Sequence, residues 1–186
     1  DYKEFVRRYP ESKKAYIVNF YYAEILYDQL ADFEGARQQY KRVIELDTGG
    51  EYVEDAALGV IYAVEELMRK TRVRWDAAKQ KWVDDPTAPP LMQTTEGDSV
   101  KVFKTGPKQE LTDEQVKEAQ VPKKAEDLHP LEADYVMAAD KYVELMEKLK
   151  AERAAKGKAM GEKGKKVPEI MYLAATVYYE RGQYSR

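Results

Sequence analysis

Cysteine is absent from the sequence, and histidine occurs once, at His129. Without thiols there are no disulfides, thiolate metal sites or cysteine nucleophiles, and a lone imidazole has no second histidine to share a metal with. No apolar run approaches the roughly 20 residues of a membrane-spanning helix. The 31 basic residues nearly balance 34 acidic ones, so the net charge of -3 does not direct the chain to nucleic acid or to an acidic membrane.

These absences leave us expecting no metal, no other cofactor, no nucleic-acid partner and no direct membrane span. The neighbouring acids at 65–66 and 84–85 point apart in a helix or strand, and the glycine-containing segment 157–166 lacks the spacing of a phosphate-binding loop. We therefore predict no catalytic residue. The chain begins within a helical pattern, which we interpret as a fragment whose lipid anchor, if it has one, lies outside the sequence.

Tyrosine is the residue that stands out among those present. It accounts for 15 of 186 residues, and aromatic residues together reach 11%. Charged residues make up 35% and the mean hydropathy is -0.72, values that fit a well-solvated, mostly helical protein. So many aromatic rings argue against a disordered chain. The length suffices for one ordinary core or for a short stack of repeats.

The stretch 21–40 predicts two amphipathic helices joined by a tight turn at 31–32. Small and aromatic residues recur there at helical spacing, at Ala23, Tyr27, Phe33, Ala36 and Tyr40. Residues three and four apart share one helical face, and a small residue such as Ala36 lets two helices approach closely. We expect these helices over about 15–30 and 33–46.

The same pattern recurs further along the chain, which predicts a repeat architecture. Tyr27 and Tyr62 are 35 residues apart, close to the length of one helix-turn-helix repeat. Further helices are expected at 51–69, at 130–150 and from 168 onward, after the end of a helix at 1–10. The recurring signature residues are Leu58, Gly59, Tyr62, Tyr135, Ala138, Tyr142, Ala174 and Tyr178.

These residues resemble the tetratricopeptide repeat family, in which helix A carries a small–large pair and a tyrosine, and helix B carries aromatic, alanine and aromatic residues. Ala31 stands where the family has glycine at the turn, and Thr48 where it has proline. The resemblance implies an all-α, right-handed solenoid of about three repeats. Residues 1–69 form its first part, 70–129 a long insertion within the second repeat, and 130–186 its continuation, including a basic linker at 150–166.

The insertion contains the only two tryptophans of the sequence, Trp75 and Trp82. The segment 71–86 fits either a short β-hairpin, which we favour, or a continued helix, because the two indoles are also seven residues apart. We further expect a strand at 99–103 and a short helix at 112–119. Trp75 and Trp82 either anchor the insertion to the solenoid or contact a partner.

The resemblance also implies a concave groove lined by helix A. The family members that bind chaperones hold a carboxylate with lysine and asparagine there, whereas Tyr21 and Ile25 occupy those places here, which argues against that function. An apolar groove instead suits an amphipathic helix or an extended apolar peptide, or it is filled by the insertion. The predicted groove residues are Val18, Tyr21, Ile25, Val53, Val60, Val64, Tyr172 and Tyr179.

The functional expectation is a non-enzymatic scaffold that binds other proteins within a multiprotein assembly. The chain is similar in style to bacterial envelope repeat proteins, which predicts a periplasmic or outer-membrane-associated location. The alternatives are a cytosolic adaptor and a regulatory or substrate-recruiting domain of a larger enzyme.

Overall fold

The computed structural model describes residues 1–92, 126–157, 159–160 and 163–183, and within them the protein is mostly helical with one small sheet. The all-α prediction is therefore confirmed, while the strand expected at 99–103 and the helix expected at 112–119 lie outside the described residues. The elements, in chain order, are α1 (Tyr2–Arg8), α2 (Ala15–Glu24), the π-helical turn η1 (Ile25–Gln29), α3 (Phe33–Leu46), α4 (Val53–Lys70), β1 (Val73–Asp76), β2 (Lys81–Asp84), α6 (Pro130–Ala155) and α7 (Val167–Glu180).

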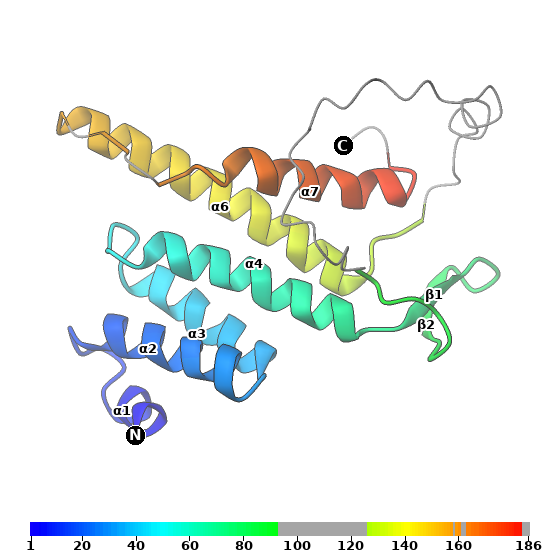
Figure 1. Cartoon of the computed structure of the whole chain (residues 1–186), viewed down its shortest axis with the longest axis horizontal. Coiled ribbons are helices and arrows are strands. Elements are labelled where there is room, and N and C mark those ends of the chain that lie inside the picture. Colours follow the sequence, from blue (N-terminus) through cyan, green and yellow to red (C-terminus); the bar gives the residue numbers. More distant parts are fainter. Residues whose placement is uncertain (93–125, 158, 161–162, 184–186) are drawn as a thin grey trace.

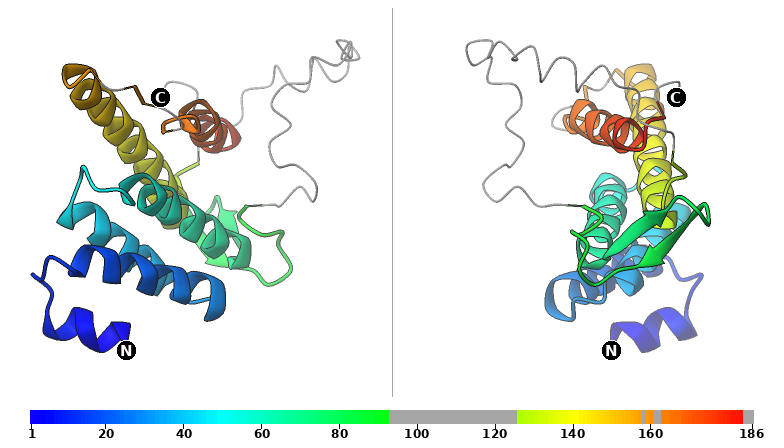
Figure 2. Two further views of the ribbon diagram at one scale, coloured as in Figure 1. Left: turned by 60° about the vertical axis from the view of Figure 1, so that its left-hand side comes forward. Right: turned by 90° about the vertical axis from the view of Figure 1, so that its right-hand side faces the viewer.

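Helix α4 occupies the centre of the molecule. It packs against α3 on one side and α6 on the other, and successive helices from α2 to α7 run in opposite directions (Figure 1). The α2–α3 pair and the α6–α7 pair consequently lie on opposite sides of α4 (Figure 2). The central position explains why residues 56–64 of α4 include no charged side chain, since a helix covered on both sides has little surface to expose to water there.

Local capping sets where two of these helices begin. The Asp32 carboxylate accepts a hydrogen bond from the Gly35 N–H at 2.9 Å at the start of α3. His129 precedes α6, accepts from the Leu131 N–H at 3.2 Å, and donates its own N–H to Glu132 at 2.9 Å. Burial lowers the pKa of His129, which favours the neutral imidazole over the charged form. His129 is therefore the N-cap of α6.

The turn between α2 and α3 places an alanine in a conformation that favours glycine. Ala31 has a φ of 49°, in the left-handed region, and the Asp32 N–H closes the turn on the Leu26 carbonyl at 2.8 Å. This is the turn at which Ala31 replaces the glycine of the repeat pattern. The replacement keeps the turn and leaves its backbone strained.

A close approach between α3 and α4 depends on Gly59. A Cβ atom at this position would lie 2.7 Å from two carbons of the Tyr40 ring, which is itself only 3% exposed. The aromatic–alanine–aromatic residues that recur in α3 and α6 are buried as well. The glycine therefore lets the ring of one helix lie directly on the backbone of the next.

Buried tyrosines also join neighbouring helices through carboxylates. The Tyr142 hydroxyl donates to Glu54 at 3.1 Å, and the Tyr135 hydroxyl donates to Glu65 at 3.3 Å, both from α6 to α4. Tyr40 of α3 donates in the same way to Glu24 of α2. Because an unpaired buried carboxylate is costly, each phenol offsets part of the desolvation of its partner.

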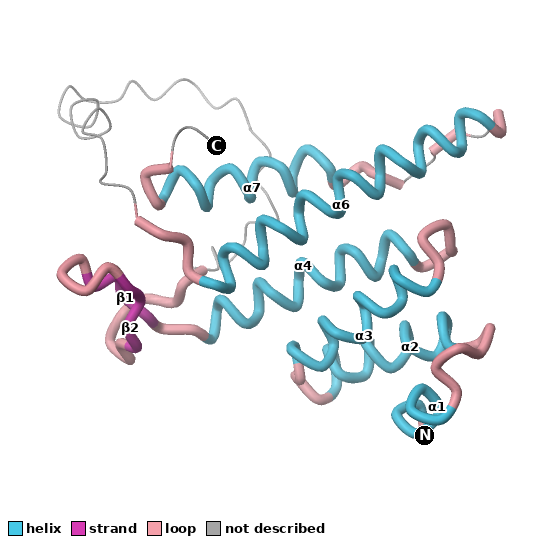
Figure 3. Tube along the Cα trace, turned by 180° about the vertical axis from the view of Figure 1, so that it is seen from behind, coloured by secondary structure: helices cyan, strands magenta, loops and turns pink. Residues whose placement is uncertain are grey.

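The segment after α4 forms the β-hairpin favoured above. Strands β1 and β2 pair antiparallel, with Trp75 directly opposite Trp82. Figure 3 shows the hairpin at the end of the molecule where α4 ends and α6 begins. A chain that leaves α4 and returns to α6 at the same end allows the two helices to pack side by side.

Two further observations complete the fold. Helix α6 continues to Ala155, beyond its expected end near 150, so the first residues of the predicted basic linker are helical. No helix among the described residues is long and apolar enough to cross a membrane.

Candidate functional site

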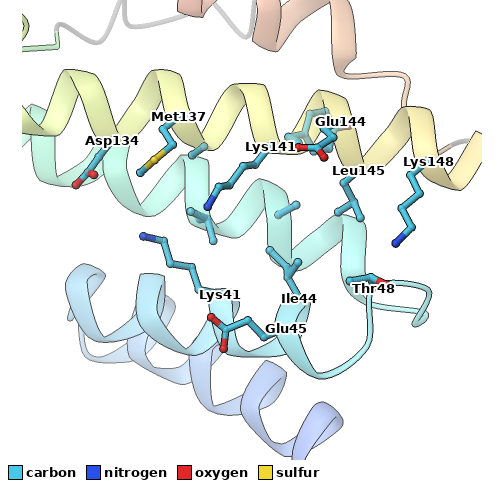
Figure 4. Close-up of a pocket in the computed structure, with 14 residues that line it drawn as sticks. Lys41, Ile44, Glu45, Thr48, Asp134, Met137, Lys141, Glu144, Leu145 and Lys148 are labelled. Atoms are coloured by element: carbon cyan, nitrogen blue, oxygen red, sulfur yellow. The ribbon is translucent and has the colours of Figure 1, made fainter.

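An open groove of about 360 Å³ lies between α3 and α6, with α4 behind it (Figure 4). It lies between the two helices that the family resemblance assigns to helix B, whereas that resemblance led us to expect a groove lined by helix A. Its lining residues are Lys41, Ile44, Glu45, Thr48, Ala57, Val60, Asp134, Met137, Ala138, Lys141, Tyr142, Glu144, Leu145 and Lys148.

The floor and inner walls of the groove are apolar. Val60 of α4 and Leu145 of α6 are buried beneath it, and Ile44 of α3 is half-buried. Met137 of α6 remains 46% exposed even though it is a large apolar side chain. An exposed methionine beside a buried apolar floor is suited to contact with another apolar surface, because a thioether adapts to varied shapes.

The rim of the groove carries lysines on both sides. Figure 4 shows Lys41 of α3 and Lys141 of α6 reaching toward each other across the opening, with Lys148 further along α6. Within the described residues no carboxylate lies at ion-pair distance from Lys41, Lys141 or Lys148.

The acidic residues of the rim are mostly engaged elsewhere. Asp134 forms an ion pair with Arg37 at 2.5 Å, and Glu45 forms one with Arg42 at 3.3 Å. Glu144 is the one acidic lining residue that has no such arginine in the described part of the chain. Of the charged lining residues, the three lysines and Glu144 are therefore those without an ion-pair partner among the described residues.

Helical spacing explains how the sequence builds this rim. On α6, Met137, Lys141, Glu144 and Lys148 follow one another at intervals of four, three and four residues, which places them along one stripe. The sequence interpretation missed this stripe because the family resemblance assigned binding to helix A. The signal that could have revealed it is a methionine aligned with lysines on a helix that otherwise buries its aromatic residues.

Three of the predicted groove residues lie inside the structure. Val53 and Val64 of α4 are 0% and 1% exposed, and Val60 is 5% exposed. The physical reason is the central position of α4, which α3 and α6 cover from two sides. Only Val60 reaches the observed groove, as part of its floor.

The predicted residues of the first repeat lie at the edge of the molecule. Tyr21 of α2 is 43% exposed, and its hydroxyl lies 3.5 Å from that of Tyr52. Val18 and Ile25 are half-buried. Tyr21 belongs to a cluster of rings in which Phe20 stacks on Tyr52 at 4.5 Å between centroids.

Tyr172 and Tyr179 of α7 are 56% and 55% exposed. Helix α7 lies at the opposite end of the helix series from α2, so the structure does not bring these tyrosines together with Tyr21 (Figure 1). None of Tyr21, Tyr172 and Tyr179 lines the α3–α4–α6 groove. Partner binding at either surface stays a prediction.

The tryptophans join the hairpin to the helices. The Trp82 indole N–H donates to the Asp127 carbonyl at 2.9 Å, and its ring lies edge-on to His129 and to Trp75. The guanidinium of Arg181, after α7, lies 4.6 Å from the Trp82 ring centroid. Arg181 also binds the buried Glu132 through two nitrogens, at 2.9 and 2.6 Å. These contacts fit the anchoring alternative for Trp82.

The chemistry available at the groove is that of apolar contact and charge pairing. The described residues contain no cluster of three or more histidine, cysteine, aspartate or glutamate side chains that could hold a metal ion. Glu65, whose pKa burial raises, is enclosed between α4 and α6 and bonded to Tyr135. Comparisons of the chain with protein-family models, with curated proteins and with solved structures found no match.

Proposed function

We propose that this chain is a non-enzymatic scaffold for protein–protein interaction, built as a right-handed tetratricopeptide-like solenoid, and that it holds another protein in the α3–α4–α6 groove. The observation that carries the proposal is the combination of the exposed Met137 with lysines that have no carboxylate partner in the described part of the chain, above an apolar floor. Apolar contact at such a centre and charge pairing at its edge are the two components of protein recognition surfaces.

The length of the groove favours a macromolecular ligand. Its α6 wall runs from Asp134 to Lys148, which corresponds to about 21 Å at 1.5 Å per residue. A surface that is long, open and flanked by two helices suits a segment of another protein more than a compact small molecule.

The solenoid itself is supported by packing. Successive helices alternate in direction, Tyr40 lies on Gly59, and the aromatic–alanine–aromatic residues of α3 and α6 are buried. The similarity to envelope repeat proteins supports a periplasmic or outer-membrane-associated assembly. A cytosolic adaptor and a recruiting domain of a larger enzyme are the alternatives.

Two methionines provide a matched test. Met137 lies in the groove, whereas Met171 lies on α7 outside it and is 54% exposed, close to the 46% of Met137. The tagged chain and its Met137→Glu and Met171→Glu variants would be purified from the native host. Each protein that the unaltered chain enriches would then be purified and its affinity measured in solution, with circular dichroism confirming that both variants fold.

We expect the purified partner to bind the Met171→Glu variant as it binds the unaltered chain, and to bind the Met137→Glu variant at least tenfold more weakly, because a buried charge would replace an apolar contact. Equal affinity for all three proteins, or a loss confined to Met171→Glu, would overturn the proposed groove.

A further inference from the structure

We infer that the occupant of the groove is an acidic amphipathic α-helix that lies along α6, with two carboxylates seven residues apart on the edge that faces Lys141 and Lys148. This inference rests on the proposed function and specifies its partner. It follows from the charge, the spacing and the length of the groove.

Charge selects an acidic partner. Lys41, Lys141 and Lys148 have no ion-pair partner among the described residues, while Asp134 is paired with Arg37. A carboxylate that enters the groove therefore meets lysines that can pair with it, whereas a lysine that enters meets few carboxylates that are not already paired. Lys41 lies on the opposite rim from Lys141, so a ligand between them meets positive charge on both edges (Figure 4).

Apolar surface selects an amphipathic partner. Between the lysines the groove presents Ile44, Val60, Met137 and Leu145. A helix that buries one apolar stripe against these side chains would place its flanking residues beside the two rims. Its acidic residues would then pair at the edges, where lysine side chains can adjust to meet them.

Spacing selects a helix over an extended peptide. Lys141 and Lys148 are seven residues apart on α6, about 10.5 Å along the axis. Carboxylates seven residues apart on a partner helix lie at the same distance and on nearly the same face. An extended peptide covers about 10 Å in three residues, and residues three apart in a strand point to opposite faces. A strand therefore matches the separation of about 10.5 Å from one edge less closely than a helix does, because its same-face residues lie about 7 or 13 Å apart.

Length sets the size of the probe. The groove wall of about 21 Å accommodates roughly 14 helical residues. The probe is a fluorescein-labelled synthetic peptide of 15 residues with leucines at helical spacing and two glutamates seven residues apart on one flank. A second peptide differs from the first in having the glutamates three residues apart and a proline in place of one central residue, which prevents the helix. A third replaces both glutamates with lysine.

Binding would be measured by fluorescence anisotropy with the full chain. The test variant is Lys141→Glu/Lys148→Glu, and the matched control is Lys13→Glu/Lys150→Glu, which changes the same charge at two exposed lysines that do not line the groove. All four positions are exposed lysines, so circular dichroism should show unchanged helix content for both variants.

We expect the acidic helical peptide to bind the unaltered chain and the control variant within twofold of each other, and the groove variant at least tenfold more weakly. The lysine peptide should show the reverse preference, because it pairs with the new glutamates. Equal binding to both variants, tighter binding of the proline peptide, or no binding of the acidic helix at millimolar concentration would overturn the inference.

The two proposals fail in different ways. If the acidic helix fails while the purified natural partner still requires Met137, the groove is a binding site for a ligand of other chemistry, and only the present inference falls. If the natural partner is also indifferent to Met137→Glu, the proposed function falls with it.

Discussion

The packing of Tyr40 on Gly59 predicts that Gly59→Ala destabilises the protein, against the ordinary preference of helices for alanine. The exposed interior of a helix gains about 1 kcal/mol when alanine replaces glycine. Here the added Cβ would lie 2.7 Å from two ring carbons of Tyr40 and 2.8 Å from a third. Carbon atoms prefer about 3.5–4.0 Å, so the ring or the helix must move.

The ring has little freedom to move. Tyr40 is 3% exposed, and its hydroxyl is bonded to Glu24 of α2. Overpacking of a core costs about 1–3 kcal/mol. Because helix propensity offsets about 1 kcal/mol of this cost, we expect a net loss of folding stability of about 1 kcal/mol. That loss is equivalent to a decrease in Tm of about 2–4 °C for a chain of this size.

Urea unfolding followed by far-ultraviolet circular dichroism measures this loss as a lower midpoint at unchanged slope. Gly49→Ala is the control, because its new Cβ would meet its nearest neighbour, an Asp47 carboxylate oxygen, at an ordinary 3.8 Å. In a Tyr40→Leu background the ring is gone, and Gly59→Ala should become neutral or stabilising. A Gly59→Ala variant as stable as the unaltered chain, or the same loss in both backgrounds, would refute the packing argument.

Three further predictions concern the turn and the buried Tyr–Glu pairs. Ala31→Gly should stabilise the chain by about 0.5 kcal/mol in urea unfolding, because relief of the left-handed backbone strain exceeds the cost of the added flexibility of the unfolded chain. A loss of stability in this variant would show that the turn is unstrained. Burial and then the neighbouring carboxylates raise the pKa values of Tyr135 and Tyr142, so the stability that the two protonated tyrosines contribute is present below about pH 10 and is lost above it. Absorbance at 295 nm should show these tyrosines ionising only as helix content falls. Their ionisation while the helices remain intact would contradict the prediction. Burial likewise raises the pKa of Glu65, so ionisation of this carboxyl lowers the stability of the protein as pH rises from about 4.5. The Glu65→Gln variant should therefore gain stability relative to the unaltered chain between pH 4.5 and pH 7. A difference in stability between the two proteins that stays constant over this range would count against a raised pKa.

Much of the local structure follows from the sequence. The helices at 33–46 and from 130 onward are predicted by stripes of aromatic and small residues, and α6 begins at the expected His129–Pro130 junction. The favoured hairpin at 71–86 contains the observed strands. These features depend on contacts within a few residues, which periodicity and capping report directly.

The candidate site was less predictable. Repeat phase assigned binding to helix A and therefore to Val53 and Val64, which the structure places in the core. The uncharged run at residues 56–64 of α4 was the available indication that this helix is covered on both sides. The lysines of the groove come from α3 and α6, whose juxtaposition no local pattern expresses.

The sequence by itself determined the helical class, the turn at 31–32 and the aromatic faces, because each arises from residues within one or two helical turns of one another. Only the tertiary structure decided which faces meet. Tyr142 bonds to Glu54 across 88 residues of sequence, and Arg181 reaches Glu132 across 49. Such pairs depend on how whole helices pack. The groove has the same origin, since it exists only where α3 and α6 lie apart over α4.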